Sequence, residues 1–168
     1  MSTLFRVGFA GGFFGLACAL AAPASAQLVT EKNLSAEMAL TMAQTAYETC
    51  KGQGYHVSVH IIDRAGLVKA ALRGDGASPH TYENSQRKAY TARTFRIPSG
   101  EFAERNMKPG EPPGAATNLT GIIAIRGALP IKVGDDVIGA IGVSGAPGGD
   151  KDEACAKAGI DKVADQLK

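Results

Sequence analysis

Three histidines are the side chains of this sequence best suited to hold a proton or a metal near neutral pH: His56, His60 and His80. His56 and His60 lie four residues apart on one face of a predicted strand, roughly 13 Å at strand rise, so they cannot both bind one metal from that strand. We interpret them as packed or interface residues. His80 stands in a loop rich in Gly and Pro before a predicted helix, where a side chain can face a ligand. An exposed or helix-capping role is the alternative for His80.

The predicted helix after His80 carries four basic residues that do not share one solvated face. Cationic groups beside an apolar face favour anionic partners. Glu83 can supply one to Arg87, four residues later on the same helix. A bound carboxylate or a neighbouring subunit is the other interpretation, and the sequence leaves both open. The four residues are Arg87, Lys88, Arg93 and Arg96.

Common catalytic and nucleotide-binding motifs are absent from the sequence. It has neither the Gly-x-Ser-x-Gly motif of hydrolases nor the His-Glu-x-x-His motif of zinc proteases. The glycine-rich segment 145–149 precedes a predicted helix but matches neither the dinucleotide pattern nor the P-loop pattern, so it is predicted to be a plain connection. The net charge of +2 gives no electrostatic reason to expect nucleic acid or an anionic membrane as a partner.

The first 26 residues have the pattern of a secretory signal peptide. Arg6 precedes an apolar stretch over 7–22, and Ala24-Ser25-Ala26 places small residues before a cut at Gln27. A membrane anchor is disfavoured because the stretch is shorter than the roughly 20 residues that span a bilayer. We therefore expect residues 27–168 to be one mature domain, periplasmic or secreted, with no membrane contact after cleavage.

Two cysteines remain after this cut, Cys50 and Cys155. Disulfides persist in oxidising compartments, so an exported chain with one pair is expected to join them. Two buried free thiols are the alternative. The bridge would connect the last turn of the first predicted helix with the first turn of the closing helix.

Periodicity predicts helices alternating with short strands. Ser35 is the expected cap of the first helix, and Asp150 with Glu153 forms a capping-box pattern at the start of the last. Hairpin connections favour an antiparallel sheet with helices packed on it, an α+β fold. The expected helices are 35–51, 81–95, 99–106 and one following 150, and the expected strands are 55–62, 67–73, 122–125, 129–133 and 137–143.

Five short segments carry distinctive motifs: 57–66, 72–77, 85–92, 139–145 and 152–156. Taken together and in order, they resemble the GlcG/HbpS-like haem-binding family (DUF336). None of them is diagnostic alone, but the set covers nearly the whole mature chain. The resemblance implies a profilin-like fold with a five-stranded antiparallel sheet, assembly into homo-oligomers, and binding of haem or a related tetrapyrrole. It supplies no agreed set of catalytic residues.

These observations lead to an extracytoplasmic haem-binding protein as the main hypothesis. Haem needs an apolar slot, cations for its two carboxylates and a ligand for its iron. His80 is the expected iron ligand, with Thr81, Tyr82 and Met107 as weaker candidates. The alternatives are an enzyme acting on haem or a small carboxylate through His80 and Arg73, and a partner-binding or structural module without a ligand. The expected carboxylate contacts are Arg73, Arg87 and Lys88.

Overall fold

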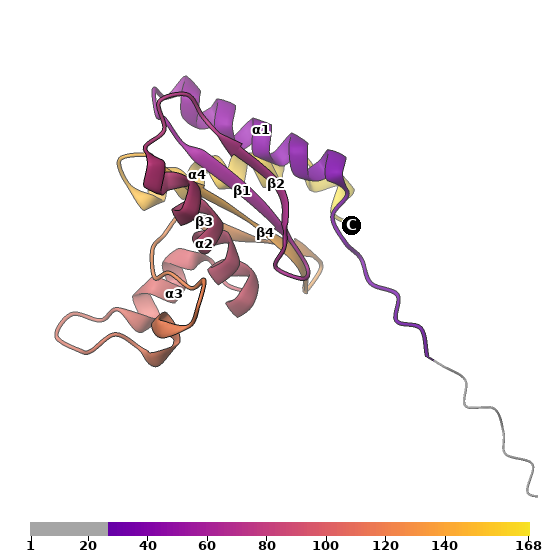
Figure 1. Cartoon of the computed structure of the whole chain (residues 1–168). Helices are drawn as coiled ribbons and strands as arrows, with labels where there is room; N and C mark the ends of the chain where they lie inside the picture. Colours follow the sequence, from indigo (N-terminus) through magenta and orange to yellow (C-terminus); the bar gives the residue numbers. More distant parts are fainter. Residues whose placement is uncertain (1–26) are drawn as a thin grey trace, which may run out of the picture. The chain divides into compact units, whose positions relative to one another are not determined.

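A four-stranded antiparallel sheet carries the helices of this protein (Figure 1). The computed structural model describes residues 27–168, and the predicted signal peptide lies outside them. The sheet order is β2-β1-β4-β3, so the first hairpin and the last hairpin meet through β1 and β4. The strands are β1 (Ser58–Asp63), β2 (Val68–Arg73), β3 (Ala128–Val133) and β4 (Asp136–Ser144).

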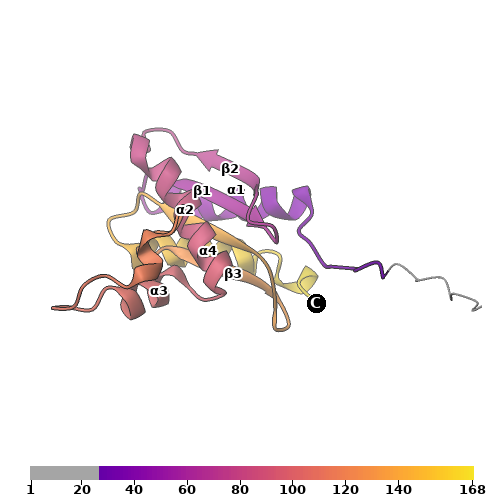
Figure 2. The same cartoon turned by 60° about the horizontal axis from the view of Figure 1, so that its bottom comes forward.

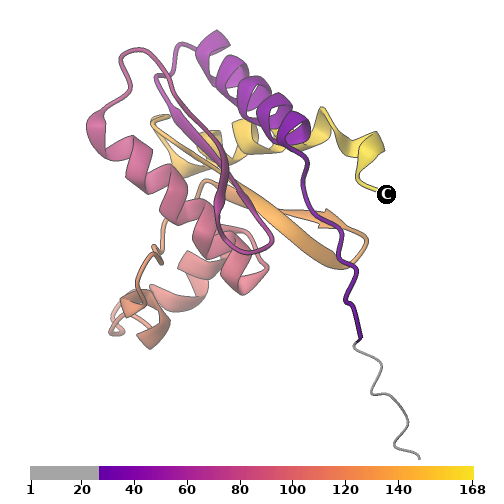
Figure 3. The ribbon, with the colours of Figure 1, turned by 45° about the vertical axis from the view of Figure 1, so that its right-hand side comes forward.

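Helices cover both faces of the sheet. Helix α1 (Ala36–Gly52) and helix α4 (Gly149–Asp161) lie side by side on one face, and α2 (Pro79–Phe95) lies on the other (Figures 1 and 3). Figure 2 shows α3 (Ser99–Asn106) next to α2, with the long connection to β3 beyond it. Short 3-10 turns cover Ala115–Asn118 and Ala164–Gln166. Among residues 27–168, no helix combines the length and the hydropathy needed to cross a membrane.

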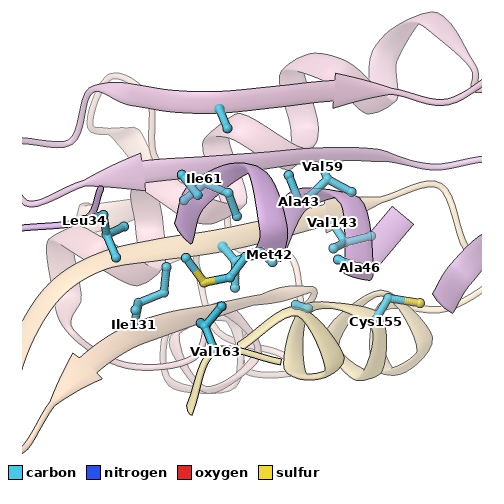
Figure 4. Close-up of a cluster of buried hydrophobic side chains, with 14 of the residues drawn as sticks. Leu34, Met42, Ala43, Ala46, Val59, Ile61, Ile131, Val143, Cys155 and Val163 are labelled. Carbon is cyan, nitrogen blue, oxygen red and sulfur yellow. The ribbon is translucent and has the colours of Figure 1, made fainter. Parts of the chain in front are cut away.

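The alternation predicted for β1 decides what each face contains. Val59 and Ile61 point toward α1 and α4, where they join the main apolar core (Figure 4). Ser58 and His60 are buried on the opposite face, under α2. One face is therefore an apolar core, while the α2 face holds buried polar groups that need hydrogen-bond partners.

Two predictions at helix starts had different outcomes. Ser35 caps α1 as predicted, because its hydroxyl accepts a hydrogen bond from the Met38 amide at 3.1 Å. The capping box predicted at Asp150 and Glu153 was wrong. Gly148 rather than Asp150 occupies the N-cap of α4, with no side-chain cap, and Glu153 pairs with Arg126.

The sheet has four strands rather than the five predicted. The missing strand is the segment 122–125, whose backbone is bonded by side chains of α2 instead of by a neighbouring strand. The Thr91 hydroxyl accepts from the Ile123 amide at 2.9 Å, and Arg87 donates to the Ile122 carbonyl at 2.8 Å. These bonds satisfy backbone groups of a partly buried segment without a neighbouring strand.

Helix α2 lies unusually close to the sheet at Gly142 in β4. A Cβ atom at this position would lie 2.2 Å from the Ser85 carbonyl oxygen. Ala89 and Ala92 on α2 contribute small side chains to the same contact. The close approach brings the middle of α2 within reach of the carboxyl end of β4, where the candidate site lies.

The predicted disulfide is present. Cys50 at the end of α1 and Cys155 in α4 are joined, with their Cα atoms 5.7 Å apart, and both side chains are fully buried. The bond closes a loop with a sequence separation of 105 residues. It fixes α4 to α1 on the apolar face.

Replacing both cysteines with serine should lower the melting temperature without abolishing ligand binding. The chain-entropy cost of an open loop of this length is about 4–5 kcal/mol, which corresponds to a fall of roughly 10 °C or more. Calorimetry of the oxidised protein, the reduced protein and the double variant tests this. An unchanged melting temperature in the double variant would contradict a stabilising role, and lost ligand binding in a still-folded variant would assign the cysteines to the site.

Candidate functional site

A polar cavity of about 430 Å³ lies where α2 and α4 both begin, next to the connection from β4 to α4. We call it the α2–α4 cavity. Its walls come from the loop and first turns of α2, from the end of β4 and from the glycine-rich segment 145–149. The lining residues are Ser78, His80, Thr81, Asn84, Lys88, Ile125, Ser144, Gly145, Ala146, Pro147, Gly148, Gly149 and Asp152.

A buried ion pair forms the floor of this cavity. Lys88 Nζ donates to Asp152 Oδ2 at 2.8 Å and to the Val143 carbonyl at 3.0 Å. The two residues are each only 3% exposed. Asp152 Oδ1 also accepts from the Ala146 amide at 3.0 Å. The pair therefore ties α2, the end of β4, the glycine-rich segment and α4 together at one point.

The surroundings of the pair explain its geometry. Gly127, with φ +132°, leaves room for it: a Cβ there would lie 2.8 Å from Lys88 Nζ and 2.9 Å from the Asp152 Cβ. Burial raises the pKa of the Asp152 carboxyl, while the charge and hydrogen bond of Lys88 and the Ala146 amide act in the opposite direction. Breaking such a pair on one side typically costs about 3–5 kcal/mol, since one charge is then left buried alone.

Three of the predicted site residues meet at this cavity. His80 lies at its exposed margin on the first turn of α2, and Thr81 and Lys88 lie deeper. The Thr81 hydroxyl already donates to the Ser78 carbonyl at 2.7 Å and is hydrogen-bonded to Ser58 Oγ.

The other predicted residues lie elsewhere. Arg73 donates to the Ala77 carbonyl at 2.9 Å in the loop before α2. Arg87 contacts the Ile122 carbonyl and lines a separate cavity with Tyr90 and Glu83. Met107 follows α3 and is 50% exposed. The structure does not bring these residues into the α2–α4 cavity.

A second, more apolar groove of about 540 Å³ lies between β3 and α4. None of the histidines and none of the predicted ligand residues lines it. Apolar residues of this groove, including Leu129 and Ile160, lie among charged side chains of both signs. Within residues 27–168, no group of three His, Cys, Asp or Glu side chains is placed to hold a metal ion.

His60 forms a buried polar cluster under α2 that the sequence did not reveal. Its Nδ1 lies 2.8 Å from Ser85 Oγ, and its ring meets the Tyr82 ring edge-on, with 4.4 Å between centroids. Ser85 donates its single proton to the Tyr82 carbonyl, so His60 Nδ1 is the donor to Ser85. Burial lowers the pKa of His60 to about 4, which keeps the ring neutral.

Sequence comparison identifies the family. The family described as "Haem degrading protein HbpS-like" matches residues 34–161. The chain belongs to the HbpS-like family. It is 30% identical over 115 residues to Protein GlcG of Escherichia coli K12, covering 68% of this chain and 84% of that protein.

Solved structures agree with this assignment. A double mutant of Streptomyces reticuli HbpS has a TM-score of 0.75 and 36% identity, covering 84% of this chain and 96% of that one. The structure titled "PduOC:Heme Complex" has a TM-score of 0.70 at 21% identity, covering 77% of this chain and 94% of that one. At that identity the second likeness supports the shared fold alone.

The cavity contains residues that sequence reasoning had not selected. Asn84, Ser144 and Asp152 line it together with the glycine-rich segment. The spacing of Lys88 beside Ala89 and Ala92 was the available signal that this lysine is buried, but nothing in the sequence named Asp152 as its partner. The segment 145–149 was predicted to be a connection, and the structure shows that this connection also forms a cavity wall.

Acid should destabilise the protein through His60. The folded pKa of about 4 lies below the ordinary value of 6.5, so between these values the unfolded chain binds a proton that the folded chain does not. The free energy of unfolding should therefore fall as the pH falls through this window, by about 2–4 kcal/mol in total. Urea unfolding at pH 7 and pH 4.5 measures it.

His60→Gln, which keeps a donor toward Ser85, should reduce this loss of stability. His56→Gln removes a histidine whose ring bonds the Asp75 carbonyl at the surface, and should retain the wild-type loss. An equally large loss of stability in His60→Gln and in the wild type would show that other groups cause it.

Proposed function

We propose that this HbpS-like protein is exported and binds haem at the α2–α4 cavity, with His80 as the iron ligand. The observation that carries the proposal is the placement of a surface imidazole at the margin of a cavity whose floor holds a buried lysine. An imidazole nitrogen is a common haem ligand, and cationic or N–H donors suit the propionate groups. The family assignment supports a haem-related function.

Different residues of the cavity suit different parts of the haem group. His80 can hold iron, and the cavity donors can hold a propionate. Ile125 and Pro147 offer apolar surface at the cavity wall, and Ile125 is 42% exposed. The lining as a whole is polar, so it suits the edge of a tetrapyrrole better than its whole apolar ring. Arg73 and Arg87 remain candidates for the second propionate, although neither lines this cavity.

The incomplete apolar cover supports the proposed homo-oligomer. Tyr82 and Ile125 are each 42% exposed, at the first turns of α2 and at the cavity wall. A second copy of the chain packed over these side chains would cover the face of the haem ring that one chain leaves open.

Light scattering of the mature protein at micromolar concentration should give a mass above that of one chain. A monomer mass both with and without haem would contradict the oligomer.

Haem degradation is a second candidate because the matching family is described as haem degrading. His80 would then hold iron or move a proton, while the chain itself shows no base–nucleophile pair in the cavity. Stability of bound haem separates the two functions. A Soret band that shifts on reduction but does not lose intensity with time, in the presence of a reductant and oxygen, supports binding, whereas progressive bleaching that depends on His80 supports degradation.

Haemin added to the mature protein should give a shifted, saturable Soret band with one haem per chain or fewer. His80→Ala should shift the band to a different ligation state and weaken binding by about tenfold or more, since it removes the iron ligand. His56→Ala is the matched control and should leave the spectrum unchanged. Absence of any Soret shift at stoichiometric haemin would overturn the proposed function, and an unchanged spectrum in His80→Ala would overturn the assigned ligand.

A further inference from the structure

The ammonium group of Lys88 has bonding capacity beyond its two protein acceptors. An ammonium has three protons, and within residues 27–168 Nζ donates to the Asp152 carboxylate and the Val143 carbonyl. Lys88 lines the cavity, so its third proton can be donated to a group inside it. A buried donor beside a polar cavity favours an acceptor that enters from outside.

Two helices begin at this cavity without a side-chain cap. The N-cap residues are Ser78 for the 17-residue α2 and Gly148 for the 13-residue α4, and neither has a capping side-chain bond. Each helix start carries roughly +0.5 of an elementary charge. Lys88 and Asp152 cancel each other. The two helix starts together supply about +1, and the Asp150 carboxylate in the first turn of α4 offsets part of it, so the site favours one added negative charge over two.

We infer that the floor of the α2–α4 cavity is a binding subsite for a single carboxylate group. One carboxylate oxygen accepts from Lys88 and the other from the backbone at the start of α4, with Asn84 and Ser144 as further polar contacts. The subsite takes a monoanion because the ion pair below it is already neutral. A phosphate dianion would bring more negative charge than the two helix starts balance.

The carboxylate can come from two sources, a propionate of haem or a free small carboxylic acid. The first case rests on the proposed haem function and the second does not. Both predict the same contacts in the cavity floor. Sodium propionate is therefore the probe, since it has the carboxylate and the short chain without the ring or the iron.

Propionate titrated into the ¹⁵N-labelled mature protein at constant ionic strength should give saturable shifts of the Asn84, Gly148 and Gly149 amides. Inorganic phosphate at pH 8, where it is mainly the dianion, and at the same ionic strength should give shifts that are smaller and do not saturate. Absence of saturable shifts with propionate, or equal binding of phosphate, would overturn the inference.

The double variant Lys88→Met with Asp152→Asn tests the role of the ammonium without leaving a buried charge alone. The side-chain amide introduced by Asp152→Asn keeps an acceptor for the Ala146 N–H. We expect the double variant to fold and to bind propionate roughly tenfold more weakly.

Asn84→Leu, which fills the cavity from α2, should weaken binding even if the double variant fails to fold. Arg105→Met on α3, which also removes one positive charge but lies outside this cavity, is the control and should bind as the wild type does. Unchanged affinity in Asn84→Leu would overturn the site.

Haem esterified at both propionates separates this inference from the proposed function. If the subsite holds a haem propionate, the wild type should bind the ester more weakly than it binds haem. The double variant should bind haem as weakly as it binds the ester. If the protein binds propionate but no haem, the subsite is supported and the haem function is refuted. Haem binding that esterification does not weaken, together with propionate binding, assigns the subsite to a free carboxylic acid.

Discussion

The candidate site of this protein depends on one buried ion pair, Lys88 with Asp152. It links three segments that are far apart in the sequence: the middle of α2, the end of β4 and the first turns of α4. Without it, the glycine-rich segment 145–149 would lose the carboxylate that accepts from the Ala146 amide. Two charges removed from water in this way stabilise a fold only when both are well bonded, which is the case here.

The two faces of the sheet have separate roles. On the α1 and α4 face, aliphatic side chains and the disulfide provide stability, and few polar groups are buried. On the α2 face, buried hydroxyls, His60 and Lys88 require partners, and these partners fix the position of α2 on the sheet. His80 belongs to the first turn of that fixed helix. The proposed iron ligand therefore lies on a rigid element with defined neighbours, as a binding site requires.

Local patterns made much of the fold predictable. The alternation in β1, the Ser35 cap and the pairing of Cys50 with Cys155 were all confirmed, because each depends on periodicity or composition. The segment 122–125 was predicted to be a strand because it is apolar, but its backbone partners are side chains of α2, which no local pattern shows.

The candidate site was less predictable than the fold. His80 could be named from its loop, whereas Asp152 had no predicted role beyond its place inside the capping-box segment 150–153. Its bond to Lys88 spans 64 positions and follows from the close packing of α2 at Gly142. A contact of this kind depends on how the helix sits on the sheet, so spacing along the chain cannot show it.

The position of bound haem decides whether the α2–α4 cavity is the binding site. Ferric haem is paramagnetic and broadens the NMR signals of nearby amides, so a ¹⁵N-labelled protein reports where it binds. Haem bound at the α2–α4 cavity should broaden the signals of Thr81, Asn84, Gly148 and Gly149, which surround it. The signals of Leu129 and Ile160, in the groove between β3 and α4, should stay sharp. Broadening at Leu129 and Ile160 with sharp signals around the cavity would contradict this placement of haem.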